Sequence, residues 1–454
     1  MRPPVRVKNP TAIDLSTPFR PSNAEKVGIE VECGAVEPGT GSCVPYEAIR
    51  DVLQSACLAL DGVPSFEDGL LTGALLPGGA RLCLEPGGAI EYASAPAADV
   101  HGVVTQALEA LKRLAEVASD HDVALLNGAF LPFDDLRDPH WVPTTRNRLM
   151  LEHYSRTGTF GQASMGMSAL AISTQATFDY LSEEDLNRKL RMQMAALPIA
   201  AAMFVNSPLA GGRLTGGLSE RMRLLLGEDP SRFGYPPFAM SESISAHDWT
   251  RWLLSLPLVY RRTPEGYTNA PDVPLGELLE HGFDDGNALT ENDWHMQLSQ
   301  VFTHVRLRET LEVRLDDGPP HPYIGAIPAF WSGLTYHPAS RDAAWELARG
   351  RTLVEQLELV EDVSRVGLAA KVAGHSVRDL AAELLDLSRL GLEARIKRGL
   401  ERPETLDLLS PLDEIVSSGR TFADRLAAQW TGELNQSAAR YVEAYRIGSD
   451  FRPC

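Results

Sequence analysis

The stretch Gly28-Ile29-Glu30-Val31-Glu32 indicates the fold of this chain most directly. Acidic and aliphatic residues alternate along it, and successive side chains of a β-strand point to opposite faces of the sheet. We therefore expect Glu30 and Glu32 on one face, with Ile29 and Val31 on the other. This pattern is typical of an antiparallel sheet that has one apolar face and one polar face.

Three later segments show a similar alternation, and each adds polar groups to one face of its strand. Residues 82–94, expected as a single strand, carry Glu85 and Glu91. The strands around 174–179 and 311–316 each place three polar side chains on one face: Gln175, Thr177 and Asp179 in the first, and Glu312, Arg314 and Asp316 in the second. Any one of these strands could be an ordinary solvated strand. Together they would line one surface with glutamate, glutamine and arginine but no lysine, which is less typical of a merely solvated face.

Carboxylates gathered on one face of a sheet repel each other, and their pKa values rise unless a cation lies among them. Mg²⁺ prefers such oxygen ligands and usually shares them with the phosphates of a substrate. The pattern therefore predicts a magnesium–nucleotide site on an open sheet. The chain has no G-x-x-x-x-G-K-[ST] sequence, which excludes a P-loop.

These segments, taken with others in the same order, resemble glutamate–cysteine ligases of the plant and proteobacterial type, including the ligase of ergothioneine biosynthesis. The resemblance runs from about residue 25 to residue 445. The further motifs that carry it are Asn206-Ser207-Pro208, Gly216 to Arg223, Asp293-Trp294, Val305 to Arg314, Pro328 to Leu334, Pro411 to Val416 and Trp430 to Glu433.

Strands mixed with helices, without a regular βαβ rhythm, favour an α+β fold with an antiparallel sheet. The resemblance implies the same class: a sheet curved into a funnel, similar to the catalytic core of glutamine synthetase, with helices outside. We expect an irregular N-terminal arm over residues 1–24, a catalytic core over 25–337 and a helical region packed on it over 338–454. Helices are expected over 46–60, 99–121, 146–156 and 182–204, an extended segment over 164–180, and later helices over 344–357, 377–390 and 422–445.

The resemblance also implies the site residues and two cofactors, ATP and Mg²⁺. It implies that Arg314 and Arg306 contact the transferred phosphoryl group or the donor carboxylate, and that Arg221 and Arg308 contact the nucleotide. Thr177 and Ser94 would lie in the substrate pocket. The expected Mg²⁺ ligands are Glu30, Glu32, Glu85, Glu91, Gln175 and Glu312, although Glu85 could instead be a turn residue before Pro86.

The implied reaction joins the γ-carboxylate of glutamate to the amine of cysteine through a γ-glutamyl phosphate, with ATP as phosphoryl donor. Departures from the family pattern at Thr177, Ala93-Ser94 and Leu225 leave open a relative that couples another acid or another amine. Glutathione, ergothioneine and specialised natural-product pathways all fit. A non-catalytic binding homologue fits less well, because it has no reason to keep mutually repelling glutamates.

Composition limits the partners of the protein. The net charge of −19 provides no basic surplus to neutralise nucleic-acid phosphates. The longest apolar run, 195–205, is shorter than the roughly 18 residues that span a bilayer, and no signal sequence is visible. Five cysteines without a C-x-x-C pair predict neither a disulfide framework nor a zinc site. We therefore expect a cytoplasmic enzyme with small-molecule substrates and no nucleic-acid or membrane partner; the sequence predicts no oligomeric state.

Overall fold

The computed structural model describes residues 13–449, and its centre is a nine-stranded sheet. Its strands are β1 (Val27–Val36), β2 (Val63–Glu67), β3 (Leu70–Leu75), β4 (Arg81–Leu84), β5 (Ile90–Ala93), β6 (Ala124–Asn127), β7 (Thr174–Phe178), β14 (Val305–Leu307) and β15 (Leu311–Val313). Their order is β14-β15-β7-β1-β5-β4-β3-β2, and β6 also pairs with β1. All these pairings are antiparallel, which confirms the expected fold class.

The other strands form two-stranded pairs outside this sheet. These are β8 (Leu209–Ala210) with β9 (Arg213–Leu214), β10 (Phe233–Gly234) with β13 (Phe302–Thr303), β11 (Tyr260–Thr263) with β12 (Gly266–Asn269), and β16 (Lys371–Val372) with β17 (His375–Ser376). The β10–β13 pair is parallel, and the other three are antiparallel.

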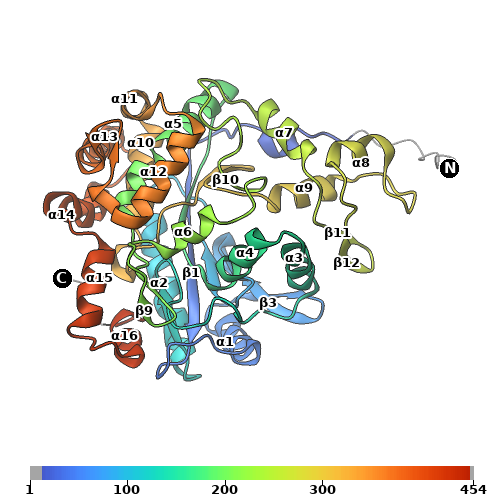
Figure 1. The fold of residues 1–454 in the computed structure, drawn as a ribbon, viewed down its shortest axis with the longest axis horizontal. Helices are drawn as coiled ribbons and strands as arrows, with labels where there is room; N and C mark the ends of the chain where they lie inside the picture. Colours follow the sequence, from blue (N-terminus) through green and yellow to red (C-terminus); the bar gives the residue numbers. More distant parts are fainter. Residues whose placement is uncertain (1–12, 450–454) are drawn as a thin grey trace.

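Helices surround the sheet and make up most of the chain after residue 326 (Figure 1). The α-helices are α1 (Tyr46–Ala59), α2 (Val100–Ser119), α3 (Thr145–Arg156), α4 (Thr159–Leu170), α5 (Glu183–Phe204), α6 (Glu220–Leu226), α7 (Ala246–Ser255), α8 (Leu275–His281), α9 (Glu291–Ser299), α10 (Ala326–Tyr336), α11 (Pro338–Ala348), α12 (Leu353–Val366), α13 (Val377–Lys397), α14 (Ser410–Ser418), α15 (Phe422–Thr431) and α16 (Ala438–Tyr445). Short 3₁₀ helices are η1 (Thr17–Phe19), η2 (Pro77–Gly79), η3 (His321–Tyr323), η4 (Gly367–Ala369) and η5 (Pro403–Leu409).

The apolar face of the sheet is covered by helices α2 and α10, which pack against β1 and β7. Ile29 and Val31 point to this side and are almost fully buried, as their alternation predicted. Removing such aliphatic side chains from water stabilises the fold by roughly 1.5–3 kcal/mol each. The opposite face of the central strands carries the polar residues and remains available for a site.

Figure 1 shows helices α10 to α14 gathered with α5 at one side of the molecule, and α7 to α9 with the β11–β12 hairpin at the other. Helices α5 and α10 come from the predicted catalytic core, yet they pack with α11 and α13 of the predicted C-terminal region. The predicted arm lies partly outside the described residues. Its described part packs on α9, where Trp294 Nε1 donates to the carbonyl of Leu15 at 3.2 Å and the Phe19 ring lies 6.2 Å from the Trp294 ring.

Several expected helices are confirmed, with their N-caps. Asp99 accepts a hydrogen bond from Gly102 N at the start of α2, and Ser182 accepts one from Asp185 N at the start of α5. Pro198 lies inside α5, which continues through it to Phe204.

The extended segment expected over 164–180 is wrong for its first half, because α4 extends to Leu170 and only 174–178 form a strand. Its alanine and methionine residues favour a helix, and the small residues between them hide the helical period. The strand expected over 82–94 is instead a hairpin of β4 and β5. Its turn needs Gly88 in the left-handed region (φ +93°), a conformation that glycine adopts readily.

Two of the expected C-terminal helices are each divided in the structure. Residues 344–357 span α11 and α12, and residues 422–445 span α15 and α16. Apolar periodicity continues across a short break, so it does not reveal where a helix stops.

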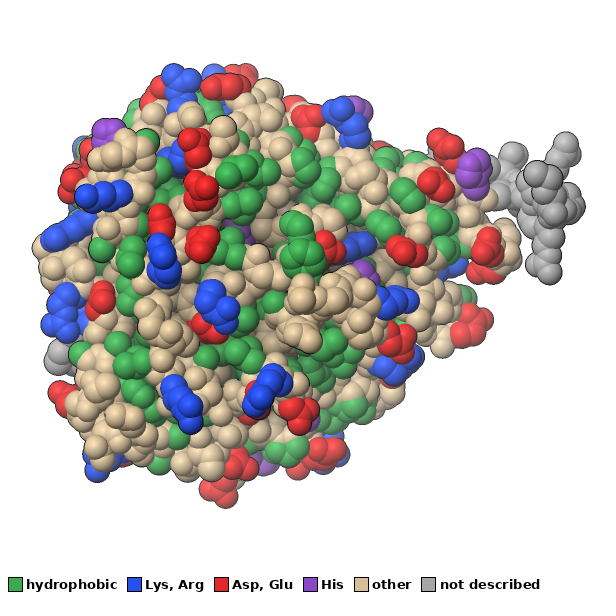
Figure 2. All heavy atoms as spheres, in the orientation of Figure 1, with side chains coloured by type: hydrophobic (Ala, Val, Ile, Leu, Met, Phe, Trp, Pro, Cys, Tyr) green, Lys and Arg blue, Asp and Glu red, His purple; other side chains and the backbone are tan. Residues whose placement is uncertain are grey.

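On the face of the molecule seen in Figure 2, acidic and basic side chains are interspersed rather than gathered by sign. Among the described residues, no helix is long and apolar enough to cross a membrane.

Candidate active site

The register of the sheet brings the predicted site residues together on one face. Glu30 of β1 pairs with Gln175 of β7, and Glu32 of β1 pairs with Glu91 of β5. Further along the sheet, Glu312 of β15 lies opposite Arg306 of β14. Because directly paired residues of antiparallel strands point to the same side, these groups form one continuous polar surface.

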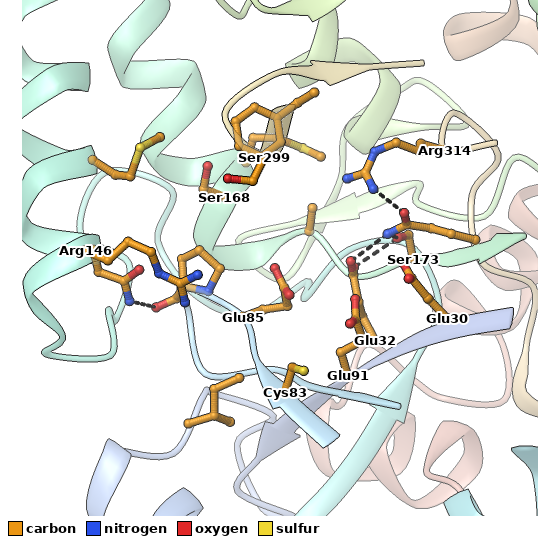
Figure 3. Close-up of a pocket in the computed structure, with 18 of the residues that line it drawn as sticks. Glu30, Glu32, Cys83, Glu85, Glu91, Arg146, Ser168, Ser173, Ser299 and Arg314 are labelled. Atoms are coloured by element: carbon orange, nitrogen blue, oxygen red, sulfur yellow. Dashed lines mark hydrogen bonds between the residues drawn. The ribbon is translucent and has the colours of Figure 1, made fainter. Parts of the chain in front are cut away.

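Three carboxylates form the tightest acidic group on this surface. Oxygen atoms of Glu32, Glu85 and Glu91 all lie within 4.8 Å of one another. Figure 3 shows them around the same space, with Glu30 beside them. Glu85 belongs to the turn between β4 and β5, where Gly88 N donates to its carbonyl at 2.9 Å. Glu85 is thus both a turn residue and a member of the acidic group.

The arginines near these carboxylates offset the effect of burial on their pKa values only in part. Burial raises the pKa of Glu30 to about 7, and the nearby Glu312 adds to this effect. Burial and the Glu85 carboxylate raise the pKa of Glu32 to about 8. Burial and the neighbouring glutamates also raise the pKa of Glu91 well above its usual value, and burial raises that of Glu85. Such a group of oxygens fits a hard divalent cation, which would supply the missing positive charge.

Glu312 has the opposite environment, because two arginines hold it. Arg306 donates to its carboxylate through Nε at 3.0 Å and through Nη2 at 2.9 Å, and Arg314 also donates to it. Burial alone would raise the pKa of Glu312, but Arg306 and Arg314 lower it to about 2. Its predicted role as a Mg²⁺ ligand stays a prediction, since both of its oxygens already have arginine partners.

Gln175 joins the two parts of the surface. Its Nε2 donates to Glu32 Oε1 and to Ser173 Oγ, both at 2.9 Å, and its Oε1 accepts from Arg314 (Figure 3). Ser173 Oγ in turn donates to Glu32 Oε2 at 3.0 Å. The amide therefore fixes the position of Glu32 relative to Arg314, and its predicted metal contact stays a prediction.

Arg221 of α6 holds the backbone that carries Arg314. Its guanidinium donates to the carbonyls of Arg314 at 2.7 Å, Leu315 at 2.8 Å and Asp316 at 3.2 Å. Arg221 also lines the cleft described below, as does the exposed Arg308. The structure is consistent with their predicted nucleotide contacts but does not test them.

The two predicted substrate residues lie at the edge of this surface. Thr177 pairs with both Gly28 and Glu312, and a Cβ atom on Gly28 would lie only 2.5 Å from Thr177 Oγ1. A glycine is therefore needed beside this threonine. Ser94 uses its hydroxyl to accept a hydrogen bond from Ile29 N at 3.0 Å, so it supports β1. For both residues a substrate contact stays a prediction.

Two acids that the alternation placed with this surface have other partners. Asp179 accepts from Ser22 Oγ at 2.5 Å and from Lys26 N at 2.9 Å, which ties the N-terminal segment to the end of β7. Asp316 accepts from Trp331 Nε1 at 2.6 Å. Both follow the last residue of their strand, where strict alternation no longer applies.

The polar surface opens into a cleft with a volume of about 710 Å³. Opposite the sheet, a wall built by α3, α4, α6, β10 and β13 closes it. Apart from Leu225, sequence reasoning missed the residues of this wall, which also include Trp141, Arg146, Tyr154, Glu228, Phe233, Tyr260, Phe302 and His304. They come from helices, loops and short strands without alternation, so only the predicted helix over 146–156 offered a signal.

The family model described as glutamate–cysteine ligase family 2 matches residues 26–442. The chain belongs to this family. Glutamate–cysteine ligase B of rice, a chloroplastic protein, is 31% identical over 412 residues, which cover 90% of this chain and 80% of that protein. The chloroplastic glutamate–cysteine ligase of Arabidopsis thaliana is 28% identical, over 93% of this chain and 80% of its own. These findings confirm the expected family.

The fold is similar to that of a solved bacterial protein. The crystal structure of glutamate–cysteine ligase from Francisella tularensis in complex with AMP matches with a TM-score of 0.56 at 12% identity, covering 94% of this chain and 90% of that one. The two proteins therefore share a fold, with a large antiparallel sheet and surrounding helices.

Proposed function

We propose that this protein is an ATP- and Mg²⁺-dependent ligase that joins the γ-carboxylate of glutamate to the amine of cysteine. The observation that supports it best is the group of three glutamates within 4.8 Å of one another at the floor of a cleft. The family membership supports the substrates, and the AMP in the Francisella tularensis structure supports an adenine nucleotide. A cytoplasmic location, where ATP and reduced thiols are available, is part of the proposal.

The residues that line the cleft have different proposed roles. Glu32, Glu85 and Glu91, with Glu30 beside them, would hold Mg²⁺. When bound, Mg²⁺ neutralises phosphate charge during transfer of the γ-phosphoryl group of ATP to a carboxylate, which makes an acyl phosphate. Arg314 and Arg306 carry positive charge on the same surface and would hold the phosphoryl group or the donor carboxylate.

Glu312 holds the guanidinium groups of Arg306 and Arg314 in place, and both arginines stay positively charged. Burial would lower the pKa of Arg314, but Glu312 and Glu32 raise it above its usual value. Burial and Arg314 lower the pKa of Arg306 to about 10, which still leaves it charged at neutral pH. Held in this way, the guanidinium groups need no reorganisation when negative charge develops between them.

A relative that couples another acid or another amine is the second candidate. It is supported by Thr177, which replaces an asparagine that the family pattern has, and whose hydroxyl cannot make the same amide hydrogen bonds. Leu225, a second departure, lies in the wall of the cleft.

The test is detection of product by mass spectrometry with ATP, Mg²⁺ and glutamate, first with cysteine alone and then with a mixture of amines. γ-Glutamylcysteine with release of ADP would support the first candidate. ADP release only with another acid or amine would support the second, and the absence of any Mg²⁺-dependent ATP turnover would contradict both.

A further inference from the structure

The wall of the cleft opposite the sheet contains a carboxyl group that the proposed metal site does not use. Glu228 follows α6, lines the cleft and is only 2% exposed. Its Oε2 accepts from Ser164 Oγ at 3.3 Å. Its Oε1 is buried and has no hydrogen-bond partner among residues 13–449.

An unpartnered oxygen of this kind is costly in a protein interior, and a hydrogen-bond donor that binds in the cleft would remove this cost. The charged and titratable groups around Glu228 are few: Arg221 on its own helix, the neighbouring Asp229, and Tyr154 on α3. Burial raises the pKa of Glu228 well above its usual value, and Arg221 offsets this only in part. A bound cation would let the carboxyl group ionise.

Glu228 lines the same cleft as Glu32 of the proposed metal site. The guanidinium of Arg221 acts on the pKa of Glu228 and on that of Glu32, so both carboxyl groups are near the same charge. A second anion in this place would repel the phosphates of ATP. It would attract an ammonium group, and of the two amino-acid substrates only the acceptor loses protons from its ammonium group in the proposed reaction.

We propose that Glu228 is a catalytic residue that binds the ammonium group of the acceptor substrate and takes one proton from it. This inference rests on the proposed ligase reaction and adds to it the residue that recognises the amine. The ligand class is a primary amine that arrives as its ammonium ion.

The step balances as follows in protons and bonds. Glu228 loses its proton to solvent when the ammonium group binds. One ammonium proton then passes to the Glu228 carboxylate, and the amine nitrogen forms a bond to the acyl carbon of the acyl phosphate. The bond between that carbon and the phosphate oxygen breaks, and the second proton leaves with inorganic phosphate.

His304 is the other candidate on this wall, since its Nε2 is also buried and unpartnered among the described residues. Burial, with Arg221 and Arg314 nearby, lowers its pKa to about 3. It therefore holds a proton too weakly to take one from an ammonium group at neutral pH, which leaves that task to Glu228.

The test compares two acceptors in the wild type and in Glu228→Gln, which keeps an oxygen for the Ser164 hydrogen bond. Cysteine arrives mainly as an ammonium ion, whereas hydroxylamine is largely neutral at pH 7. We expect kcat with cysteine to fall by roughly 10²-fold or more and kcat with hydroxylamine to fall much less, because a general base typically contributes 10²–10⁴-fold. Glu228→Asp, which restores a carboxyl group, should recover part of the cysteine rate.

Asp229→Asn is the matched control, because Asp229 caps the next turn through Ser231 N at 2.9 Å and does not line the cleft. It should keep both rates. Equal losses with both acceptors in Glu228→Gln would overturn the proposal, as would a raised KM for ATP with an unchanged KM for cysteine, which would assign Glu228 to the nucleotide. Thermal unfolding shows whether Glu228→Gln is folded. If it is not, the comparison of the two acceptors is made with Glu228→Asp instead.

Positional isotope exchange in ATP tests the underlying reaction separately. If the wild type shows no glutamate-dependent exchange, the proposed ligase reaction itself fails. If exchange occurs but Glu228→Gln treats the two acceptors alike, only the role of Glu228 fails.

Discussion

The polar face of the sheet has two parts in which the same residue type has opposite surroundings. On β15, Glu312 is held by Arg306 and Arg314, and the pKa of its carboxyl group falls to about 2. On β1, Glu32 accepts hydrogen bonds from the neutral side chains of Ser173 and Gln175, and burial raises its pKa to about 8.

The difference shows which part of the site is complete. The pair of arginines satisfies Glu312 without any ligand, so this half is built to present positive charge to a substrate. The glutamates around Glu32 are the opposite, since burial raises their pKa values by more than the nearby arginines lower them. Buried carboxylates of this kind ionise together only when a cation binds among them.

The largest expected effect is a loss of activity when a residue of the group Glu32, Glu85 and Glu91 is replaced. Replacing Glu91 with glutamine removes one proposed Mg²⁺ ligand, and we expect ligase turnover at saturating ATP to fall by about 10³-fold, since a catalytic metal supplies several kcal/mol of charge stabilisation. Steady-state release of ADP measures this. Turnover within a few-fold of the wild type would remove Glu91 from the metal site.

The next effect is on the free energy of unfolding. Removing a carboxylate should lower it in the part around Glu312 but not in the part around Glu32. Glu312→Gln leaves Arg306 and Arg314 buried without their carboxylate, and we expect the free energy of unfolding to fall by about 3–5 kcal/mol. Glu91→Gln is the matched comparison, because it removes a carboxylate that its neighbours repel. It should leave the metal-free protein as stable as the wild type or more stable. Urea unfolding of both variants in EDTA tests the pair, and equal losses would contradict the contrast.

A smaller effect is the pH dependence of the metal-free protein. The folded-state pKa of Glu32, about 8, lies above its usual value of 4.5, so between these values the folded protein binds more protons than the unfolded chain. Stability therefore falls as pH rises through this window, by at most about 1.4 kcal/mol per pH unit for one group. From pH 5 to pH 8, the unfolding free energy of the wild type should therefore fall relative to that of Glu32→Gln, which has no carboxyl group to titrate at this position.

Glu312 provides the opposite sign for the same experiment. Its folded-state pKa of about 2 lies below the usual 4.5, so its stabilising contribution is present above that value and is lost as pH falls toward 2. A pH-independent difference for Glu32→Gln would show that Glu32 titrates normally in the folded protein. Saturating Mg²⁺ should also remove the dependence for Glu32.

The smallest effect concerns Ser94, whose hydroxyl accepts from Ile29 N. Ser94→Ala should cost about 1 kcal/mol of stability, the usual worth of one such hydrogen bond, and change the KM for either amino acid little. Chemical denaturation and steady-state kinetics measure the two quantities. A large rise in the KM for glutamate at unchanged stability would instead support the substrate contact expected from the sequence.

Much of the sheet could be predicted from the sequence, because alternation fixes which face a strand residue occupies. Glu30, Glu32, Glu91 and Gln175 lie on one surface for this reason. Alternation does not say which partner a side chain meets across the sheet, so it placed Glu312 on the same surface as Glu32 without distinguishing their surroundings. Only the pairing of β14 with β15 shows that Glu312 lies opposite an arginine.

The far wall of the cleft could not be predicted, since no period marks it. Helix α4 was expected to be extended, and Glu228 lies after the last turn of α6, where apolar spacing carries no information about direction. Its role depends on its burial beside Ser164 of α4, a contact between segments that lie 64 residues apart in the sequence.

The most direct test is calorimetric titration of the protein at pH 7 with a non-hydrolysable ATP analogue, with and without Mg²⁺, in two buffers of different ionisation enthalpy. If Glu30, Glu32, Glu85 and Glu91 hold Mg²⁺, tight binding will require the metal and will release protons from carboxyl groups whose pKa values lie near 7 and 8. Both features should disappear in a Glu32→Gln, Glu91→Gln double variant. Binding that is equally tight without Mg²⁺, or that releases no protons and survives both substitutions, would contradict the account.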